Sequence, residues 1–350
     1  MFHYFNQKKI LVTGHTGFKG SWLVLWLKII GANVSGISLP PKSKNDHINH
    51  LSTDIESHYQ DINDYDKTFK IIKKINPDFI FHLAAQPLVR ESYNMPIETW
   101  QTNVIGTANI LNISRSLNNL KGVLVVTSDK CYENREIDYG YKEDDKLGGF
   151  DPYSSSKAAV ELLVSSFRNS FFSNTDTPLI ASARAGNVIG GGDWSSDRLF
   201  PDIVRSIQSK NALLIRNPNA TRPWQHVLDC LYGYLVLAEN LLKTNGRAYD
   251  QAWNFGPSKS SNIKVIDILK KVKNLWDDFE WVIDDGLNNH EANLLYLDSS
   301  KSQKLLHWKS ILDIDETLSW TINWYKEFLN NNVISINQIN NFMKLIEKTK

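Results

Sequence analysis

The chain has 350 residues, of which 39 are lysine or arginine and 38 are aspartate or glutamate, so its formal net charge is +1. Such a nearly neutral chain is a poor polyelectrolyte for nucleic acid or for an anionic membrane surface. With 42% hydrophobic and 22% charged residues, the composition is that of a chain with a large core and not of a disordered one. The length predicts two coupled domains, or one large one.

Targeting and redox signals are absent from the sequence. The longest apolar runs, such as residues 22–27, fall far short of the ~20 residues needed to span a bilayer. The first nine residues, MFHYFNQKK, lack the apolar region of a signal peptide. Two cysteines, Cys131 and Cys230, give neither a disulfide framework nor a metal-ligand pattern. We therefore expect a cytoplasmic protein in a reducing setting.

The first half of the chain alternates strand-like and helix-like segments, which are distinguished by their length and hydrophobic periodicity. The predicted strands are 9–13, 33–38, 79–83, 123–128 and 179–185, and the predicted helices are 17–30, 65–75, 96–117 and 154–170. Gly31 is placed to end the first helix, and Pro77 follows the second. This alternation predicts an α/β fold of Rossmann type, with a doubly wound parallel sheet covered on both faces.

The second half is less regular. The glycine-rich stretch 186–194 predicts a loop, 262–276 and 313–330 predict helices, and 331–350 predicts a terminal helix on the surface. The chain shows no internal repeat and no linker-like break. We therefore expect a first domain over 1–185 and a smaller, mixed α/β domain over 186–350, packed closely together, with some later segments returning to the first domain.

The first predicted strand runs directly into a glycine turn and then into the first predicted helix. Gly14, Gly17 and Gly20 follow the spacing G-x-x-G-x-x-G. The glycines permit a tight turn and a close backbone approach, and the helix N-terminus presents free N–H groups to a pyrophosphate. In this order of elements, a dinucleotide site is favoured over glycine-assisted packing alone. We expect this turn, including Thr16 and Phe18, to bind a nicotinamide dinucleotide.

The segment after the second strand leaves the choice between NAD and NADP open. An acidic residue there would hold the adenosine ribose, but the strand ends with Ser38 and no carboxylate. Lys42 and Ser43 follow, and a 2′-phosphate could lie near such a lysine. Asp61 and Ile62 occupy the place of an expected adenine contact, although Asp61 could equally open the helix that follows. We expect NAD, with NADP as the alternative.

Tyr153 and Lys157 are four residues apart at a helix start after Pro152, so both side chains share one helix face. A phenol is a poor base near neutral pH because its reference pKa is about 10. A neighbouring ammonium and an oxidised nicotinamide would favour the phenolate, which could then take the proton of a sugar hydroxyl while hydride leaves the carbon. For the pair alone a solvated helix face is the alternative, and the glycine turn argues against it.

Together these motifs resemble the extended short-chain dehydrogenase/reductases over about residues 8–330. HLAAQP at 82–87 and Asn103 in TNVIGT fit the cofactor-binding strand ends of that family, which implies cofactor contacts at Leu83, Ala84, Ala85 and Asn103. Within the family, four segments resemble the nucleotide-sugar 4,6-dehydratases, and those acting on CDP-glucose most closely. These segments are TSDKCY at 127–132, QPLVRESY at 86–93, ARAGNVIGGGDW at 183–194 and RPWQHV at 222–227.

The resemblance implies a dehydration centred on Ser128, Asp129 and Lys130, where the strand 123–128 ends and ligands are bound in such sheets. Related dehydratases carry Asp-Glu where this chain has Asp129-Lys130, whereas an epimerase needs only the hydroxyl and the tyrosine. A solvated loop is the alternative for this pair. We expect Tyr153, aided by Ser128, to take the 4-hydroxyl proton while hydride leaves C4. Lys130, a base only when neutral, then takes the C5 proton, Asp129 protonates the departing 6-hydroxyl, and the tightly bound cofactor returns its hydride to C6.

The substrate side is carried by residues that can hold a diphosphate. Arginine offers a bidentate fork to phosphate, although surface solubility is the alternative for any single arginine. The implied substrate contacts are Gln86, Arg90, Ser128, Asn187, Arg198, Arg216, Arg222 and His226. Related dehydratases with other nucleotides show arginines near the segment that reads HEANLLYLD at 290–298 in this chain, so its nucleotide-side contacts depart from theirs.

These inferences predict a hydro-lyase that converts CDP-D-glucose to CDP-4-dehydro-6-deoxy-D-glucose. The resemblance implies a place in deoxysugar biosynthesis for polysaccharides such as lipopolysaccharide O-antigen. The alternatives are a nucleotide-sugar 4-epimerase or reductase, or another nucleotide-sugar 4,6-dehydratase, on the same fold. A non-catalytic nucleotide-binding regulator is disfavoured because it has no need of the proton-transfer set Ser128, Tyr153 and Lys157.

Metal catalysis is disfavoured because the histidines are scattered and form no helical ligand pair. Solvated side chains are the safer interpretation of His3, His15, His47, His50 and His58. The family usually pairs through two helices, which here would be 96–117 and 154–170. The resemblance therefore implies a homodimer or a dimer of dimers.

Overall fold

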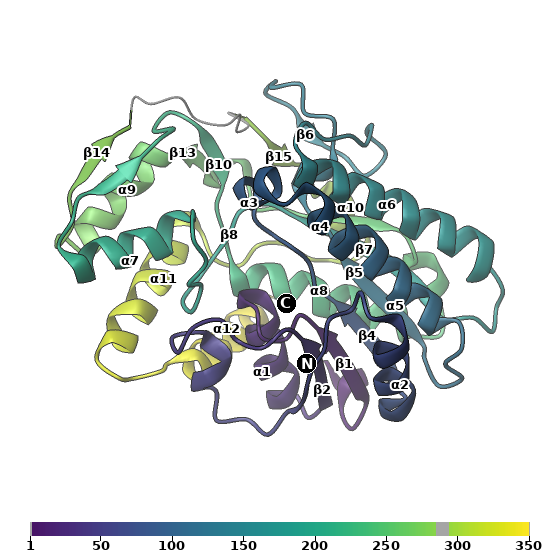
Figure 1. Ribbon diagram of the computed structural model, residues 1–350. Helices are drawn as coiled ribbons and strands as arrows, with labels where there is room; N and C mark the ends of the chain where they lie inside the picture. The colour runs from purple at the N-terminus through teal and green to yellow at the C-terminus, as the bar shows by residue number, and fades with distance from the viewer. Residues whose placement is uncertain (1, 285–293, 350) are drawn as a thin grey trace.

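The described residues, 2–284 and 294–349 of a computed structural model, form a central parallel sheet of seven strands (Figure 1). The strand order is β12-β7-β5-β4-β1-β2-β3. The strands are β1 Lys9–Thr13, β2 Asn33–Ser38, β3 Glu56–Tyr59, β4 Phe79–His82, β5 Gly122–Val126, β7 Leu179–Ala185 and β12 Ala252–Phe255. The order reverses between β1 and β4, and the carboxyl ends of strands at such a switch point hold ligands. The predicted Rossmann-type α/β fold is confirmed.

One face of this sheet is covered by helices with aliphatic side chains. These helices are α2 Tyr65–Ile75, α5 Gly106–Ser114 and α6 Pro152–Phe171. Their buried residues, such as Ile72, Ile110 and Val160, pack on strand residues such as Ile80 and Val123. The inner strands are mostly apolar on this face, as a covered parallel sheet requires, except where Ser182 and Arg184 of β7 bind Glu161 of α6.

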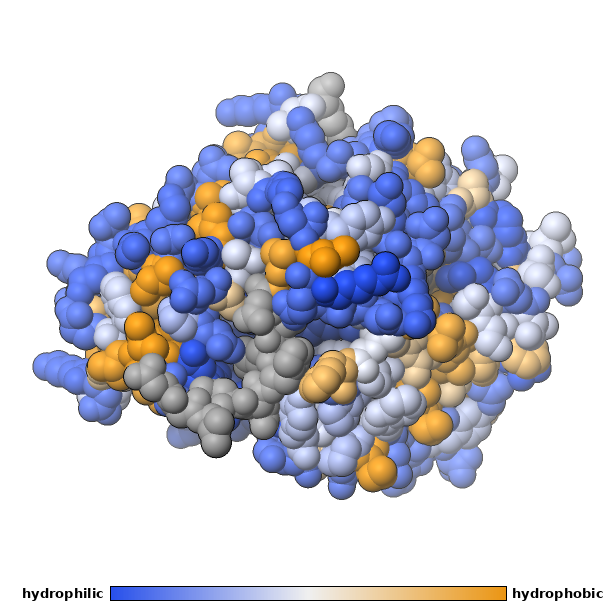
Figure 2. Space-filling view, turned by 90° about the horizontal axis from the view of Figure 1, so that it is seen from above, coloured by the Kyte–Doolittle hydropathy of each residue, from blue (hydrophilic) through white to orange (hydrophobic). Residues whose placement is uncertain are grey.

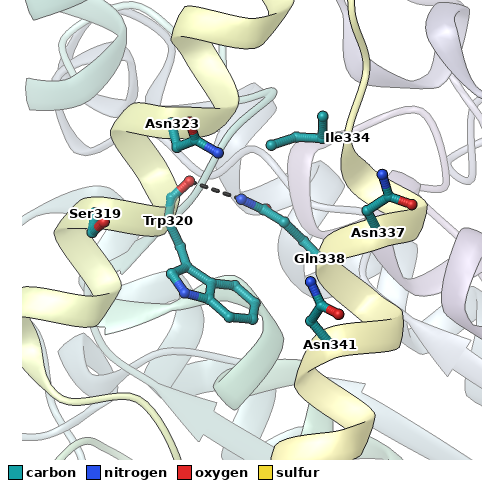
Figure 3. Close-up of a pocket in the computed structure, with 7 residues that line it drawn as sticks. All are labelled: Ser319, Trp320, Asn323, Ile334, Asn337, Gln338 and Asn341. Atoms are coloured by element: carbon teal, nitrogen blue, oxygen red, sulfur yellow. Dashed lines mark hydrogen bonds between the residues drawn. The ribbon is translucent and has the colours of Figure 1, made fainter.

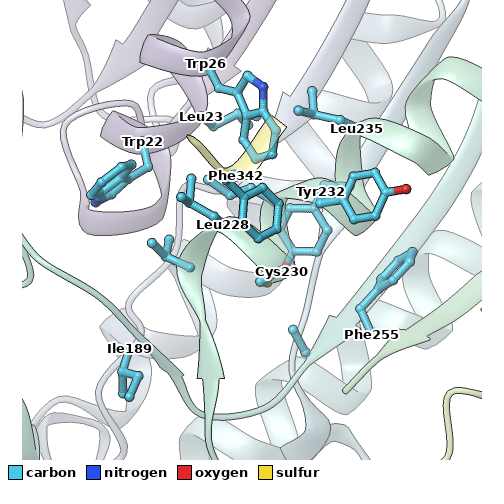
Figure 4. Packing of buried hydrophobic residues seen from close by; sticks show 14 of the residues in the cluster. Trp22, Leu23, Trp26, Ile189, Leu228, Cys230, Tyr232, Leu235, Phe255 and Phe342 are labelled. Carbon is cyan, nitrogen blue, oxygen red and sulfur yellow. The ribbon is translucent and has the colours of Figure 1, made fainter. Parts of the chain in front are cut away.

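The opposite face carries an aromatic core that joins the two halves of the chain. Here lie α1 Phe18–Ile29, α8 Val227–Leu241 and α12 Ser335–Thr349. Figure 4 shows Trp22 and Trp26 of α1 near Phe342 of α12 and Tyr232 of α8. The Trp26 and Phe342 rings meet edge to face with centroids 5.7 Å apart. The last helix is therefore part of the main core.

Two helices differ from their predictions. The stretch 96–117 is divided into α4 Pro96–Trp100, a π-helical turn Gln101–Ile105 that contains the buried Asn103, and α5. The terminal helix forms at the surface as predicted, but the prediction did not foresee that the apolar side of α12, with Ile339, Phe342 and Ile346, is fully buried. An amphipathic pattern in which asparagine and lysine dominate the exposed side conceals such a face.

The second half supplies short paired strands and helices beside the sheet. The pairs are β8 Val188–Ile189 with β11 Gln225–His226, β9 Leu213–Ile215 with β14 Trp281–Ile283, β10 Thr221–Pro223 with β13 Asn262–Lys264, and β6 Gly140–Tyr141 with β15 Tyr296–Leu297. The remaining helices are α3 Val89–Asn94, α7 Leu199–Ser209, α9 Val265–Leu275, α10 Ser300–Leu305 and α11 Ile314–Leu329. Because β12 extends the central sheet, and α8 and α12 cover it, later segments do return to the first domain. The boundary at residue 185 stays a prediction.

The surface offers no membrane-crossing element: among the described residues, no helix combines the length and apolarity needed to traverse a bilayer. Figure 2 shows one face, which is mostly hydrophilic with separate apolar patches. A polar groove also lies between α11 and α12 (Figure 3). It is lined by Ser319, Trp320, Asn323, Ile334, Asn337, Gln338 and Asn341. None of the residues expected to bind cofactor or substrate lines this groove.

Candidate active site

The glycine turn after β1 has the geometry of a dinucleotide cradle. Gly14 has a φ of +74°, and a Cβ there would lie 2.7 Å from the backbone nitrogen of Ala84. A Cβ on Gly20 would lie 2.0 Å from the carbonyl oxygen of Gly14, so only glycine fits at both positions. Gly17 is the N-cap of α1 and no side chain caps it, so the first N–H groups of the helix are left for a ligand such as a pyrophosphate. Phe18 is the first residue of α1.

The end of β4 is tied to this turn by hydrogen bonds. The Thr13 hydroxyl oxygen accepts from the backbone N–H groups of Leu83 and Ala84, both at 3.2 Å, and lies 2.7 Å from His82 Nδ1. Burial lowers the pKa of His82 to about 3, with the nearby charge of Lys157 acting in the same direction, so this imidazole is neutral. The expected cofactor segment 83–85 therefore lies directly against Gly14.

The segment after β2 fits NAD better than NADP. Ser38 Oγ lies 2.7 Å from Thr16 Oγ1, so the strand end and the glycine turn are in contact. The backbone N–H groups of Lys42 and Ser43 donate to the carboxylate of Asp46 at 2.7 and 3.1 Å. Because a carboxylate already takes these donors and carries negative charge, the segment disfavours a 2′-phosphate. The sequence interpretation missed Asp46, which lies eight residues beyond the strand.

The residues expected near adenine are placed at the start of α2. Asp61 Oδ1 accepts from the backbone N–H of Asn63 at 2.9 Å, and Ile62 is buried. Asp64, and not Asp61, caps the helix by accepting from the Lys67 backbone N–H at 3.1 Å. The competing interpretation of Asp61 as the residue that opens the helix is therefore wrong, because Asp64 does so.

Gln86 and Asn103 are held by internal hydrogen bonds. Asn103 Oδ1 accepts from the Gln86 backbone N–H at 2.8 Å, and its Nδ2 donates to Ser156 Oγ at 2.8 Å. The Gln86 amide donates to Thr99 Oγ1 at 2.9 Å and accepts from the Leu88 backbone N–H at 2.5 Å. Asn103 thus connects the turn after β4 to α6, the Gln86 side chain connects it to α4, and a ligand contact at Gln86 stays a prediction.

Ser128, Asp129 and Lys130 follow β5 and lie together as the sequence predicts. Ser128 caps a short 3₁₀ turn, Asp129–Cys131, and its hydroxyl donates to Asp129 Oδ1 at 2.9 Å. Lys130 Nζ donates to the same oxygen at 3.1 Å and to Asn187 Oδ1 at 3.4 Å. Asp129 is 1% exposed. The Asp–Lys pair is therefore no solvated loop, and Asn187 lies beside it.

Tyr153 and Lys157 are buried on the face of α6 that meets this segment. Pro152 begins the helix, and the Asp151 carboxylate caps it by accepting from the Ser154 N–H at 2.9 Å. Burial raises the pKa of Tyr153 to about 12, and its hydrogen bond with Ser128 opposes this rise. Burial, and then the charge of Lys19, lowers the pKa of Lys157 to about 8. Burial thus outweighs the neighbouring side chains at Tyr153, so the oxidised nicotinamide, which is also expected to favour the phenolate, has to supply much of the effect.

The site consists of two neighbouring groups of side chains. The catalytic cluster comprises Ser128, Asp129, Lys130, Tyr153 and Lys157, and the arginine cluster comprises Arg90, Arg198 and Arg216 with Asp193 and Asp197. Arg198 Nη1 lies 2.9 Å from Asp193 Oδ2. Arg90 and Arg216 both bind Asp197 Oδ1, at 2.7 and 3.0 Å. The charge of Arg198 acts on Tyr153, which places the arginine cluster beside the catalytic one. Sequence inspection found the arginines but missed both aspartates, which lie in the glycine-rich loop and just after it.

Two other expected substrate residues have contacts within the protein. Arg222 Nη1 donates to the Thr221 carbonyl oxygen at 2.9 Å. His226 is fully buried, and its Nδ1 accepts from the Leu228 N–H at 3.2 Å as the N-cap of α8. The structure thus gives His226 a capping role, and its contact with substrate stays a prediction. Of the segment 290–298, residues 290–293 lie outside the described residues, and Tyr296–Leu297 form β15.

Two of the histidines interpreted as solvated are in fact buried. His15 contacts Ser57 Oγ at 3.0 Å, and His47 lies between Ser21 and Ser335 at 2.8 and 2.7 Å. Burial lowers the pKa of His15 to about 4 and that of His47 to about 3, so both are neutral core side chains. The prediction was wrong for them because polar flanking residues do not show which side of a turn faces the core. In the described part of the chain, no three histidine, cysteine or acidic residues are grouped as metal ligands.

Glu161 and Arg184 are buried residues that the sequence interpretation either missed or left without a role. Glu161 continues the helix face of Tyr153 and Lys157 by one more turn, and its Oε2 lies 2.8 Å from Arg184 Nη2. A continued i, i+4, i+8 spacing was the signal available for Glu161. Lys19, which lies between Gly17 and Gly20 of the glycine motif, was also left without a role; its Nζ donates to the Tyr234 hydroxyl at 3.2 Å.

Known proteins are similar to this chain in sequence and in fold. The profile of the GDP-mannose 4,6 dehydratase family matches residues 11–321. The CDP-glucose 4,6-dehydratase of Salmonella typhimurium is 46% identical over 93% of this chain and 93% of its own.

Two solved structures share the fold. An epimerase from Methanothermobacter thermautotrophicus has a TM-score of 0.83, with 24% identity over 94% of this chain and 95% of its own. A dTDP-glucose 4,6-dehydratase from Bacillus anthracis, in complex with NAD, has a TM-score of 0.74, with 21% identity over 91% of this chain and 96% of its own. The chain belongs to the GDP-mannose 4,6 dehydratase family, within the extended short-chain dehydrogenase/reductases.

Proposed function

We propose that this protein is a hydro-lyase that converts CDP-D-glucose to CDP-4-dehydro-6-deoxy-D-glucose. The observation that carries the proposal is the catalytic cluster, in which an acid and a potential base follow the serine that contacts Tyr153. The choice of the cytidine nucleotide is supported by 46% identity to a CDP-glucose 4,6-dehydratase. The product would serve deoxysugar biosynthesis for surface polysaccharides such as O-antigen.

The cofactor is NAD, which when bound accepts hydride from C4 of the sugar and returns it to C6. The glycine turn, the N-terminus of α1 and the segment 83–85 would hold it, and the carboxylate of Asp46 supports NAD over NADP. The protein groups then perform the proton transfers. Tyr153 takes the 4-hydroxyl proton, and the resulting 4-keto group acidifies the C5–H bond.

Elimination of water requires a base at C5 and an acid at the 6-hydroxyl. Lys130 takes the C5 proton, and Asp129, in its protonated form, gives a proton to the leaving hydroxyl, so that water departs and a C5–C6 double bond forms. Lys130 returns its proton to C5 when hydride reaches C6. The base at C5 must be neutral, which is compatible with its partner Asp129 when that carboxyl carries the proton.

These transfers leave one proton too many on Tyr153 and one too few on Asp129. Ser128 lies between them, since its hydroxyl donates to Asp129 Oδ1 at 2.9 Å and shares a hydrogen bond with Tyr153. A shift of protons along Tyr153–Ser128–Asp129 therefore restores the starting state without solvent. This gives the serine a role in dehydration beyond the one it would have in an epimerase.

Substrate binding is assigned to the arginine cluster and Asn187, which adjoin the catalytic cluster. Guanidinium groups would bind the diphosphate by charge-assisted hydrogen bonds. For Arg222, the Arg-x-Trp match supports a contact with the nucleotide. We further propose a homodimer, or a dimer of dimers, built on α4, α5 and α6. Ile97 and Trp100 of α4, Ile105 of the π-helical turn and Leu162 of α6 are exposed there. A reducing cytoplasm suits the two free, buried cysteines.

The test is a product analysis with CDP-, UDP- and dTDP-glucose and GDP-mannose, carried out with and without added NAD. CDP-glucose deuterated at C4 should lose one water, show the alkali-induced absorbance of a 4-keto-6-deoxy sugar, and carry its deuterium at C6. Deuterium retained at C4 with inverted configuration would identify an epimerase. Net formation of reduced cofactor would identify a dehydrogenase, and a preference for another nucleotide would overturn the choice of CDP.

A further inference from the structure

A fully buried ion pair lies directly beneath the catalytic cluster. Glu161 of α6 and Arg184 of β7 are 4% and 3% exposed, and their closest charged atoms are 2.8 Å apart. Burial alone would raise the pKa of Glu161, but the Arg184 guanidinium outweighs it, so the carboxyl pKa lies below its ordinary value. A buried pair of this kind is weak evidence of stabilisation in itself, since desolvation offsets the attraction. Its position suggests a further role.

The pair holds both ends of the segment that carries Ser128, Asp129 and Lys130. At the near end, Thr127 Oγ1 donates to Glu161 Oε1 in a short hydrogen bond. At the far end, Arg184 Nη1 donates to the Tyr132 hydroxyl at 2.6 Å. The guanidinium also lies over the Tyr132 ring, 5.0 Å from its centroid. The three catalytic residues therefore lie between two anchors on one ion pair.

Other elements complete the anchoring. Ser182 Oγ donates to Glu161 Oε2 at 2.7 Å, Arg184 Nη1 donates to the Glu143 carbonyl oxygen at 2.9 Å, and the Tyr132 hydroxyl donates to Asn254 Oδ1 at 2.8 Å. The network thus connects α6, β5, β7 and β12. Movement of the catalytic segment would break charge-assisted hydrogen bonds in a buried site, where unpaired groups are costly.

The same carboxylate acts on the charge of Lys157. Four groups face this ammonium: Lys19 from α1, His82 from β4, Cys131 from the 3₁₀ turn and Glu161 from its own helix. His82 is neutral, and burial raises the pKa of Cys131, so neither carries a charge near neutral pH. Glu161 lies one helical turn after Lys157 on the same face of α6, and its negative charge opposes the lowering of the Lys157 pKa by burial and by Lys19.

We propose that Glu161 and Arg184 are positioning residues that fix the catalytic segment and keep Lys157 charged. The inference deepens the proposed function and rests on it. Lys157 acts on Tyr153 in its charged form, so its loss of a proton sets an upper pH limit on the reaction. Without the carboxylate, the ammonium loses its proton at lower pH, so the alkaline limb of the pH profile must move towards neutrality.

The experiment compares Glu161→Gln with Ser182→Ala in the full-length protein saturated with NAD, using steady-state dehydration of CDP-glucose from pH 6 to 10. Glu161→Gln removes the negative charge, whereas Ser182→Ala removes one hydrogen bond to the same carboxylate and leaves its charge. For Glu161→Gln we expect the alkaline limb of kcat to move down by about 1 unit or more, kcat at pH 8 to fall about 5-fold or more, and KM to change little. Ser182→Ala should leave the limb in place.

A second variant covers the case in which Glu161→Gln does not fold. Arg184→Lys keeps the positive charge but loses the planar fork that reaches Glu161 and Tyr132 together. It should lower kcat about 10-fold with KM and the alkaline limb unchanged. An unmoved limb in Glu161→Gln, an equal shift in Ser182→Ala, or a wild-type kcat in Arg184→Lys overturns the inference. Failure of the proposed function would appear differently, as a wild-type protein that dehydrates none of the nucleotide sugars.

Discussion

The catalytic cluster and the arginine cluster are neighbours, yet they differ in solvent exposure: the first is mostly buried, and the second lies partly at the surface. Tyr153, Lys157 and Asp129 are buried and hydrogen-bonded within the protein, whereas the Lys130 side chain is 26% exposed. Arg90 and Arg216 are 39% and 24% exposed, and both bind one oxygen of Asp197. The buried groups of the catalytic cluster are thus fixed by the fold, whereas Arg90 and Arg216 are held by the Asp197 carboxylate near the surface.

The difference follows from what each cluster has to do. Proton transfers require fixed geometry within hydrogen-bond distance, so a rigid and buried set is favourable. A diphosphate has to enter and leave, so its arginines must release internal partners at low cost. A half-exposed ion pair contributes about 1 kcal/mol or less, and substrate phosphate can replace it. Under the proposed function, the diphosphate would take the place of Asp197 on Arg90 and Arg216 while the substrate is bound.

The largest expected effect comes from removing the proposed base, Lys130, from the catalytic cluster. Lys130→Met should abolish water loss while C4 oxidation remains possible, because the base for C5 is missing but Tyr153 is intact. Loss of a positioned base lowers a rate by roughly 100- to 10,000-fold. The measurement is single-turnover kinetics that follow reduced cofactor and product separately. Lys146→Met is the matched control, since Lys146 is an exposed lysine that also pairs with an acid, Glu133. Full dehydration by Lys130→Met would contradict the assignment of the base.

A second test concerns His82, the last residue of β4, which is buried between Thr13 and Thr107. Its folded-state pKa of about 3 lies below the ordinary value of 6.5, so the unfolded chain binds the proton more tightly. Its contribution is complete above pH 6.5 and is lost as the pH falls towards 3. Between pH 7 and 5 the loss is about 2 kcal/mol in the free energy of unfolding.

Denaturant unfolding of His82→Gln at both pH values checks this sign. The variant should lose about 2 kcal/mol less than the wild type between pH 7 and 5, because it has no imidazole to protonate at this position. His3→Gln, at an exposed position, is the control. Equal pH dependence of the two variants would mean that the His82 imidazole is not held neutral by the fold.

The smallest expected effect concerns Asp197 of the arginine cluster. Asp197→Asn removes the carboxylate that competes for Arg90 and Arg216, so KM for CDP-glucose should fall, by at most about 5-fold, with kcat unchanged. Asp202→Asn, which breaks the nearby pair with Arg205, is the control and should leave KM unaltered. A higher KM in Asp197→Asn would show that the aspartate positions the arginines for substrate and does not compete with it.

The sequence predicted the first half of the fold well and the second half poorly. The strands 9–13, 33–38 and 179–185 are found with the predicted bounds, because runs of apolar residues in a parallel sheet carry an unambiguous pattern. The two- and three-residue strands after residue 186 are set by tertiary pairing and leave no periodic pattern. The π-helical turn at Gln101–Ile105, which contains the buried Asn103, leaves no signal in the spacing of apolar residues.

The same contrast holds within the site. The sequence identified Tyr153, Lys157 and Ser128 because their spacing is local or follows a strand end. It missed Asp197 because a partner shared by Arg90 and Arg216, which lie 126 residues apart in the chain, is a long-range property. It could not foresee that burial raises the pKa of Tyr153, since a sequence shows neighbours along the chain but not the depth of a side chain.

The packing of the last helix on the first has a consequence for synthesis of the chain. Domains generally form as the N-terminal part leaves the ribosome. Here Trp26 of α1 contacts Phe342, and His47 near α1 is hydrogen-bonded to Ser335, so the packing of the first helix is completed only by residues 335–342. A nascent chain that lacks α12 would leave part of the aromatic side of α1 uncovered. Exposed apolar surface of this kind makes an incomplete chain prone to aggregation.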